Sequence, residues 1–217
     1  MRSISHWIGT LLVVLFFALF ATPVAAETVP VETKDLASGR HAHMHMLLEK
    51  TVLGVDVVTV DMQFDAKTAE RLEAASKGKK YSKEAADEIA TAAYRAENAF
   101  VRMRFERHVS FDDFVEGSRK SLGFALKAGM ITKANYDRSY NGLPQWFGFL
   151  KKNGIHKGDR IYYRAKPDSL RTVYVDHQGK TMLDQTDDGA DPRLALLAPF
   201  FAPGSDFREP LIRSQFE

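Results

Sequence analysis

Alternating apolar and polar positions mark the segments that we expect to form strands. From His41 to Phe64 apolar residues recur at every second position, with Gly54 between two such runs. A period of two is typical of a strand with one buried face, so this stretch predicts a strand pair, or one long strand bent at Gly54. Phe100 to Val109 alternates in the same way. Three later segments separated by turn residues predict an antiparallel meander: Arg160 to Ala165, Arg171 to Asp176 and Lys180 to Asp184.

Apolar residues three and four positions apart mark the expected helices. Residues Ala66 to Glu97 are rich in Ala, Glu and Lys and are interrupted at Lys77 to Lys80, which favours two surface helices. Ser110 suits a helix N-cap and precedes an apolar stripe that begins at Phe111. Three more helices are expected, at Tyr136 to Lys152, Asp191 to Phe201 and Phe207 to Phe216.

The order of these segments predicts the fold class. Strands come early and late, with helices between and after them, and the strict strand-helix alternation of a parallel sheet is missing. We therefore expect an α+β fold in which helices pack on one face of an antiparallel sheet. The domain is expected to span residues 41 to 217. Residues 27 to 40 contain Pro30 and Gly39 and little apolar periodicity, so they predict a flexible lead-in.

The first 26 residues have the order of parts of a secretory signal peptide. Arg2 precedes an apolar run from Trp7 to Ala21, and small residues follow up to Ala26. The run is shorter than the roughly 20 residues that span a bilayer as a helix. We expect cleavage after Ala26, which would leave a periplasmic or secreted protein without a stable membrane anchor.

Composition excludes several kinds of chemistry. The 217 residues include no cysteine, which rules out disulfides, thiolate-zinc sites and cysteine nucleophiles. Stability must come from apolar burial, to which 15 Phe residues contribute. The formal net charge is +2 and charges of both signs are interspersed, so we expect no nucleic-acid partner.

Several segments of the second half, taken in order, resemble a known family. They are Val101 to Gly117, the run Lys157-Gly158-Asp159-Arg160-Ile161-Tyr162-Tyr163, the hairpin end Gln178-Gly179-Lys180, and the terminal segments from Leu194 to Phe216. This order resembles the chalcone isomerase-like fold, specifically its exported bacterial branch, over roughly Leu47 to Phe216. The resemblance implies an open-faced antiparallel β-sandwich with helices layered on it and a cleft between them. Plant members of the family close a flavanone ring, whereas other members bind fatty acids without catalysis.

The polar groups of the plant enzymes are largely missing from the matching positions. The resemblance puts the family's helical Tyr at Phe114, its Asn near Ser121 and its late hydroxyl residue near Ala202, and the nearest cation is Lys50. Phe and Ala cannot donate hydrogen bonds to a developing charge. We therefore expect no chalcone isomerase activity, and an isomerase-type enzyme of unknown substrate stays an alternative.

The same substitutions predict an apolar ligand site. Phe114, Ser121 and Leu122 would line the cleft, with Lys50 or Arg104 as a cation at its mouth. Such a cleft suits a small apolar or amphiphilic ligand, for example a fatty acid. The alternative is that these apolar residues merely fill the core.

Alternate histidines predict a second possible site. His41, His43 and His45 would share one face of a strand, where they could bind zinc or copper. With Met44 or Met46 they could also ligate haem. The alternative is that these histidines are solvated at a strand end, and His108, His156 and His177 are also expected to face solvent.

Overall fold

The computed structural model describes residues 29–50 and 55–217. The predicted signal peptide, the cleavage point after Ala26 and the bend at Gly54 lie outside these residues. No helix within the described ranges is long and apolar enough to cross a membrane.

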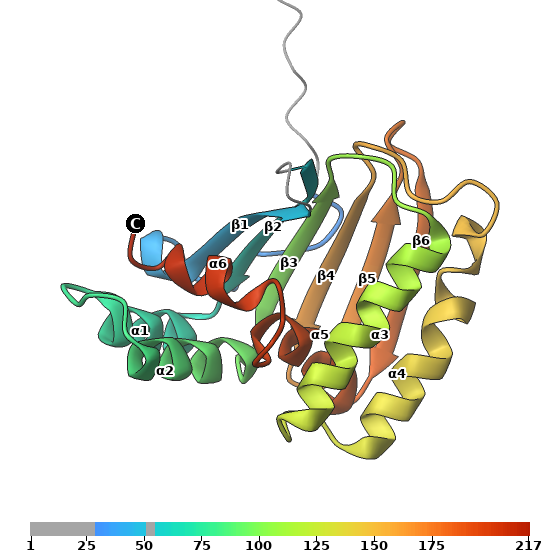
Figure 1. Ribbon diagram of the computed structural model, residues 1–217. Coiled ribbons are helices and arrows are strands. Elements are labelled where there is room, and N and C mark those ends of the chain that lie inside the picture. Colours follow the sequence, from blue (N-terminus) through green and yellow to red (C-terminus); the bar gives the residue numbers. More distant parts are fainter. Residues whose placement is uncertain (1–28, 51–54) are drawn as a thin grey trace, which may run out of the picture.

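The described residues form a six-stranded antiparallel sheet in which each strand pairs with the strand before it in the chain (Figure 1). The stretch from His41 to Phe64 is a strand pair, as the first of its two interpretations predicts, and the late meander is also present. The strands are β1 (His43–Lys50), β2 (Val55–Phe64), β3 (Ala99–Phe105), β4 (Arg160–Lys166), β5 (Ser169–Val175) and β6 (Thr181–Asp188).

The helices lie on one face of this sheet (Figure 1), so the predicted α+β class and layering are confirmed. Side-chain caps fix where four of them begin: Asp65, Ser82, Thr132 and the predicted cap Ser110 each accept a hydrogen bond from the backbone N–H three residues later. The helices are α1 (Ala66–Ser76), α2 (Lys83–Tyr94), α3 (Phe111–Lys127), α4 (Lys133–Trp146), α5 (Ala190–Phe201) and α6 (Arg208–Arg213), with 3-10 turns η1 (Arg40–Ala42) and η2 (Gly148–Leu150).

Helix α4 differs from the helix predicted at Tyr136 to Lys152. It begins earlier, at the Thr132 cap, and ends at Trp146, before η2. Pro144 has no N–H to give the carbonyl of Tyr140, one turn earlier. The Arg119 guanidinium of α3 donates to that carbonyl from Nε and Nη2 at 3.1 and 3.0 Å and stacks 4.0 Å from the Tyr140 ring centroid. A neighbouring helix therefore supplies the hydrogen bond that proline removes.

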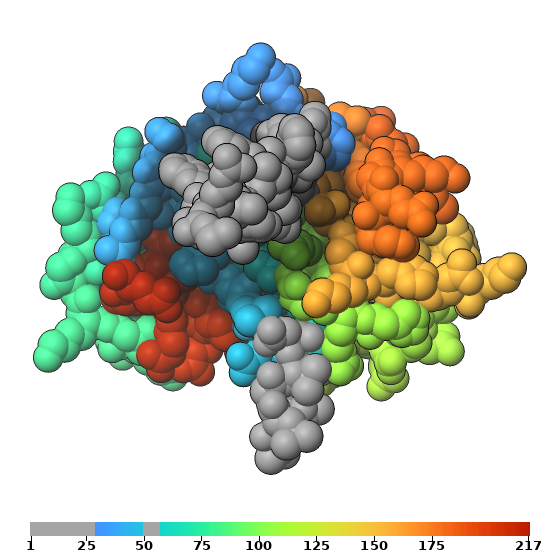
Figure 2. Space-filling model, turned by 90° about the horizontal axis from the view of Figure 1, so that it is seen from above, coloured from blue at the N-terminus to red at the C-terminus, as the bar shows by residue number. Residues whose placement is uncertain are grey.

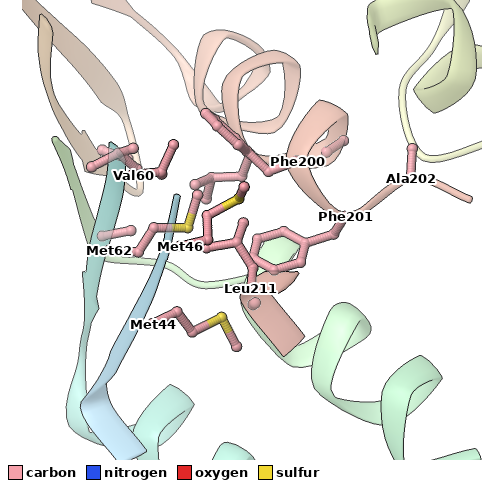
Figure 3. Packing of buried hydrophobic residues seen from close by; sticks show 14 of the residues in the cluster. Met44, Met46, Val60, Met62, Phe200, Phe201, Ala202 and Leu211 are labelled. Atoms are coloured by element: carbon pink, nitrogen blue, oxygen red, sulfur yellow. The ribbon is translucent and has the colours of Figure 1, made fainter. Parts of the chain in front are cut away.

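The hydrophobic core lies between the inner face of the sheet and the helices. Met44 and Met46 of β1 point toward Phe201 and Leu211 of the C-terminal helices, as Figure 3 shows. All four are at most 4% exposed. The C-terminal residues also protect the outer edge of β1, where the Ser214 hydroxyl accepts from the backbone N–H of His45 and the Gln215 amide donates to the carbonyl of His43. Seen from above, they lie beside β1 at one end of the molecule, and β5 and β6 lie at the other (Figure 2).

The opposite face of the sheet is covered by residues 29–40, for which we expected a flexible lead-in. Val31 is only 6% exposed and packs in a small cluster with Phe100, Tyr162 and Val173. Arg164, 4% exposed on this face, donates to the Glu32 carbonyl at 2.9 Å and to the Asp35 carboxylate. The segment thus has fixed partners and acts as a cover for the sheet.

Candidate functional site

A cavity of about 540 Å³ lies between the inner face of the sheet and helices α3, α4 and α5. Its size falls within the range of roughly 300 to 1,000 Å³ that is usual for small-molecule sites. Much of its wall is apolar because the inward positions of β3 and the facing stripe of α3 carry apolar side chains. The apolar lining includes Met103 and Phe105 of β3, Phe114 and Leu122 of α3, Trp146 of α4 and Leu196 of α5.

Three of the five predicted ligand-site residues line this cavity: Phe114, Ser121 and Leu122. Phe114 is half-buried, and its ring meets those of Phe105 and Phe147 edge-on, with centroids 6.3 and 5.0 Å apart. The Ser121 hydroxyl is held by the carbonyl of Gly117, 3.1 Å away. The apolar stripe of α3 therefore forms a cavity wall as well as part of the core.

Two glycines of α3 show where the helix is not closely packed. A Cβ atom added at Gly117 or at Gly123 would meet no other atom within 4 Å. Gly117 lines the cavity, whereas Gly123 lies on a separate shallow groove between α3 and α4. The space under α3 at Gly117 is therefore open to a side chain or a ligand.

The floor of the cavity carries a row of polar side chains that the sequence analysis missed. Tyr163 of β4 pairs directly with Thr172 of β5, and Thr172 pairs with Gln185 of β6. All three line the cavity. Directly opposed side chains in an antiparallel sheet have Cβ atoms about 5 Å apart, so the three form one continuous strip. We call Tyr163, Thr172 and Gln185 the polar strip.

Several polar groups in the wall have no hydrogen-bond partner within residues 29–50 and 55–217. They include the Tyr163 and Thr172 hydroxyls and the side-chain amide of Asn135, at the start of α4. Thr172 is 8% exposed and Asn135 is 5% exposed. Burial raises the pKa of the Tyr163 hydroxyl, which therefore keeps its proton and can donate at physiological pH. Buried polar groups are normally paired, so these groups are free to bind a ligand.

Charged residues of both signs surround the cavity. Arg138 of α4 has no ion-pair partner in the described part of the chain. Within the polar strip, the Gln185 amide nitrogen donates to both oxygens of Asp187 at 3.1 and 3.2 Å. The lining cations are Arg107, Lys120 and Arg138, and the lining carboxylates are those of Asp113, Glu116, Asp187, Asp191 and Asp206. The site therefore has no excess of positive charge.

Of the two cations predicted for the mouth of the cleft, Arg104 does not line the cavity. Arg104 lies on the opposite face of the sheet, because alternation along β3 sends it to the side of Phe100, and it pairs there with Glu106 at 3.6 Å. The placement of Arg104 at the cleft is thus corrected. Lys50 is the last residue of β1, where its backbone pairs with Val55, and its side chain lies outside the described part of the chain. Ala202 is fully buried in the core and does not line the cavity.

The three N-terminal histidines do not share a strand face. His41 lies in η1, where its Nδ1 atom is 3.2 Å from the Ser76 hydroxyl. His43 and His45 point outward from β1 and are exposed, and the Met44 and Met46 sulfurs are buried in the core (Figure 3). Among the described residues, no three His, Asp or Glu side chains gather where they could hold a metal ion.

His108, His156 and His177 form an unexpected row at one end of the sheet. The His156 ring centroid lies 5.8 Å from that of His108 and 5.2 Å from that of His177. Behind this row is Asp159, 2% exposed, which accepts from the Tyr174 hydroxyl at 2.5 Å and from His177 Nδ1 at 3.0 Å. Asp159 also accepts from the backbone N–H groups of His156 and His177.

The hydrogen bonds to Asp159 decide its charge. Burial alone would raise the pKa of this carboxyl, but the donors from Tyr174, His156 and His177 outweigh burial and hold the pKa below its ordinary value. The same environment raises the pKa of Tyr174, through burial first and then through its bond to Asp159. None of these groups lines the cavity, so the network ties together the ends of β4 and β5.

No family model and no curated protein matches the sequence. Among solved structures, a fatty-acid binding protein from Arabidopsis thaliana aligns with 80% of this chain and 91% of its own, with a TM-score of 0.46 and 14% sequence identity.

Proposed function

We propose that this chain binds a small apolar or amphiphilic molecule, such as a fatty acid, in the cavity beneath α3, without catalysing a reaction on it. The observation that carries the proposal is the cavity of about 540 Å³. Its largely apolar wall would take an alkyl tail or ring, and its unpartnered hydroxyl and amide groups would bind a polar end.

A substitution that fills the cavity tests this proposal. In Gly117→Trp the indole would occupy the open space under α3, where a Cβ meets no atom within 4 Å. The matched control is Gly123→Trp, which adds the same side chain to the same helix beside the outer groove. We expect purified wild-type protein and Gly123→Trp to take up dodecanoate or 1-dodecanol, as measured by native mass spectrometry and calorimetry, and Gly117→Trp to take up neither.

Two results would refute the binding function. One is a wild-type protein that retains no lipid from cells and takes up no added amphiphile. The other is a Gly117→Trp variant that is folded and binds as well as the control.

We also propose that the chain is exported and cleaved after Ala26. The proposal is supported by the basic start, the apolar run and the small residues at positions 1–26. Amino-terminal sequencing of the protein from the cell envelope should give Glu27 as the first residue, and an intact Met1 would refute it.

A further inference from the structure

The polar strip gives the cavity a chemical preference that its apolar wall alone would not have. Inward positions elsewhere on the sheet are mostly apolar, and so are Ile161 and Ala165, which flank Tyr163 on β4. At the centre of β4 to β6 the same face instead carries Tyr163, Thr172 and Gln185. The Tyr163 and Thr172 hydroxyls line the cavity, and an apolar ligand that displaced water from them without a polar group of its own would leave them unpaired, at a cost in binding. The strip is therefore best explained by a polar group of the ligand.

The hydrogen-bonding capacity of the strip defines that group. The Tyr163 hydroxyl, whose pKa is raised by burial, serves as a donor, and the Thr172 hydroxyl can both donate and accept. The Gln185 amide nitrogen is already engaged by Asp187, which leaves its carbonyl oxygen as an acceptor. A group that pairs with the Tyr163 proton and with the Gln185 carbonyl oxygen accepts at the first and donates at the second.

The charge of the ligand's polar group distinguishes the two remaining candidates, an ionised carboxylate and a hydroxyl. None of the described side chains of the strip is a cation, and the Asp187 carboxylate lies on the same strand two residues from Gln185. An ionised carboxylate placed on the strip would lie near this like charge, whereas the lining cations Arg107, Lys120 and Arg138 all lie outside β4, β5 and β6. A hydroxyl both accepts and donates without a charge.

We propose that the cavity recognises an uncharged, hydroxyl-bearing amphiphile, such as a fatty alcohol or a monoacylglycerol, through Tyr163, Thr172 and Gln185. This inference rests on the proposed binding function and adds the class of polar group and the residues that select it.

Three probes with the same alkyl chain test the preference: 1-dodecanol, dodecyl methyl ether and dodecanoate. The ether can accept but not donate, and dodecanoate carries the charge. We expect wild-type protein to bind dodecanol about tenfold more tightly than either of the others, the effect of about one hydrogen bond. Calorimetry at one pH and salt concentration measures all three affinities.

Two conservative variants assign the preference to the strip. Tyr163→Phe and Thr172→Val keep the shape of the wall and remove one hydroxyl each, so each should lower the affinity for dodecanol about tenfold. Matched controls are Tyr162→Phe and Thr186→Val, neighbouring residues that do not line the cavity and should leave binding unchanged.

The outcomes separate this inference from the binding function. Equal affinity for the three probes, tighter binding of dodecanoate, or unchanged dodecanol binding in both variants would overturn the role of the strip while leaving the cavity a binding site. Failure of every probe to bind wild-type protein would overturn both.

Discussion

Asp159 is the residue whose replacement should affect stability most clearly. Its carboxylate accepts four hydrogen bonds, from the Tyr174 hydroxyl, the His156 amide, and the amide and ring of His177. In Asp159→Asn the side-chain nitrogen replaces one oxygen, so two of these donors lose their acceptor. Hydrogen bonds to charged groups contribute about 1.5–3 kcal/mol each, and the half-exposed His177 can partly regain water. We expect a loss of about 2–4 kcal/mol in the free energy of unfolding.

The pH dependence of this loss follows from the lowered pKa of Asp159. A carboxyl whose pKa is lower in the folded state stabilises the fold above its unfolded pKa of about 3.9. That contribution is lost as the pH falls through the folded pKa. The difference between wild type and Asp159→Asn should therefore be full at pH 7 and shrink below about pH 4.

Urea unfolding followed by tryptophan fluorescence measures both effects. Tyr174→Phe serves as the matched variant, since it removes one donor, leaves the other three in place, and should cost about 1–2 kcal/mol. A loss below about 1 kcal/mol for Asp159→Asn at pH 7, or a difference that grows at low pH, would refute this account of the network.

Three further predictions concern turns, helices and histidines. Gly154→Ala should lower the free energy of unfolding by about 1–3 kcal/mol in the same urea assay, because φ is +66° and a Cβ would lie 2.6 Å from the Val109 carbonyl oxygen. Gly179→Ala, where φ is +85° but the space is open, should lower it by only about 1 kcal/mol. Arg119→Met should lower the free energy of unfolding by about 1 kcal/mol, because it removes the donor to the Tyr140 carbonyl. The loss should be smaller in a Pro144→Ala background, where the backbone N–H of residue 144 can make that hydrogen bond. Equal losses in both backgrounds would contradict this compensation. The double variant His43→Ala, His45→Ala should show the same affinity for zinc, copper and haem as the wild type in calorimetry. The reason is that His41 faces Ser76 and the Met44 and Met46 sulfurs are buried. A clear loss of affinity would support the metal or haem alternative.

Alternation along the chain predicted the sheet but could not assign its faces throughout. In β3 the contrast between Val101, Met103 and the arginines shows one apolar side, and applying it strictly would have excluded Arg104 from the cleft. In β4 both faces are covered, so the pair Tyr162 and Tyr163 does not reveal which ring points inward. The polar strip was missed for that reason.

The candidate site was predictable only where one helix builds it. Phe114, Ser121 and Leu122 follow from the apolar stripe of α3 and from the resemblance. Thr172 and Asn135 are far apart in sequence and are polar, so nothing local distinguishes them from surface residues. Only the packing of the sheet against α4 leaves them buried without partners.

The cover formed by residues 29–40 has a consequence for the order of folding. Glu32 and its partner Arg164 are 132 positions apart, and the cluster around Val31 needs β3, β4 and β5 to be in place. Contacts of such long sequence separation close slowly, so we expect residues 29–40 to dock last. Until then Phe100, Tyr162 and Val173 would face water, and a chain shortened to begin at His41 would keep that surface exposed and tend to aggregate.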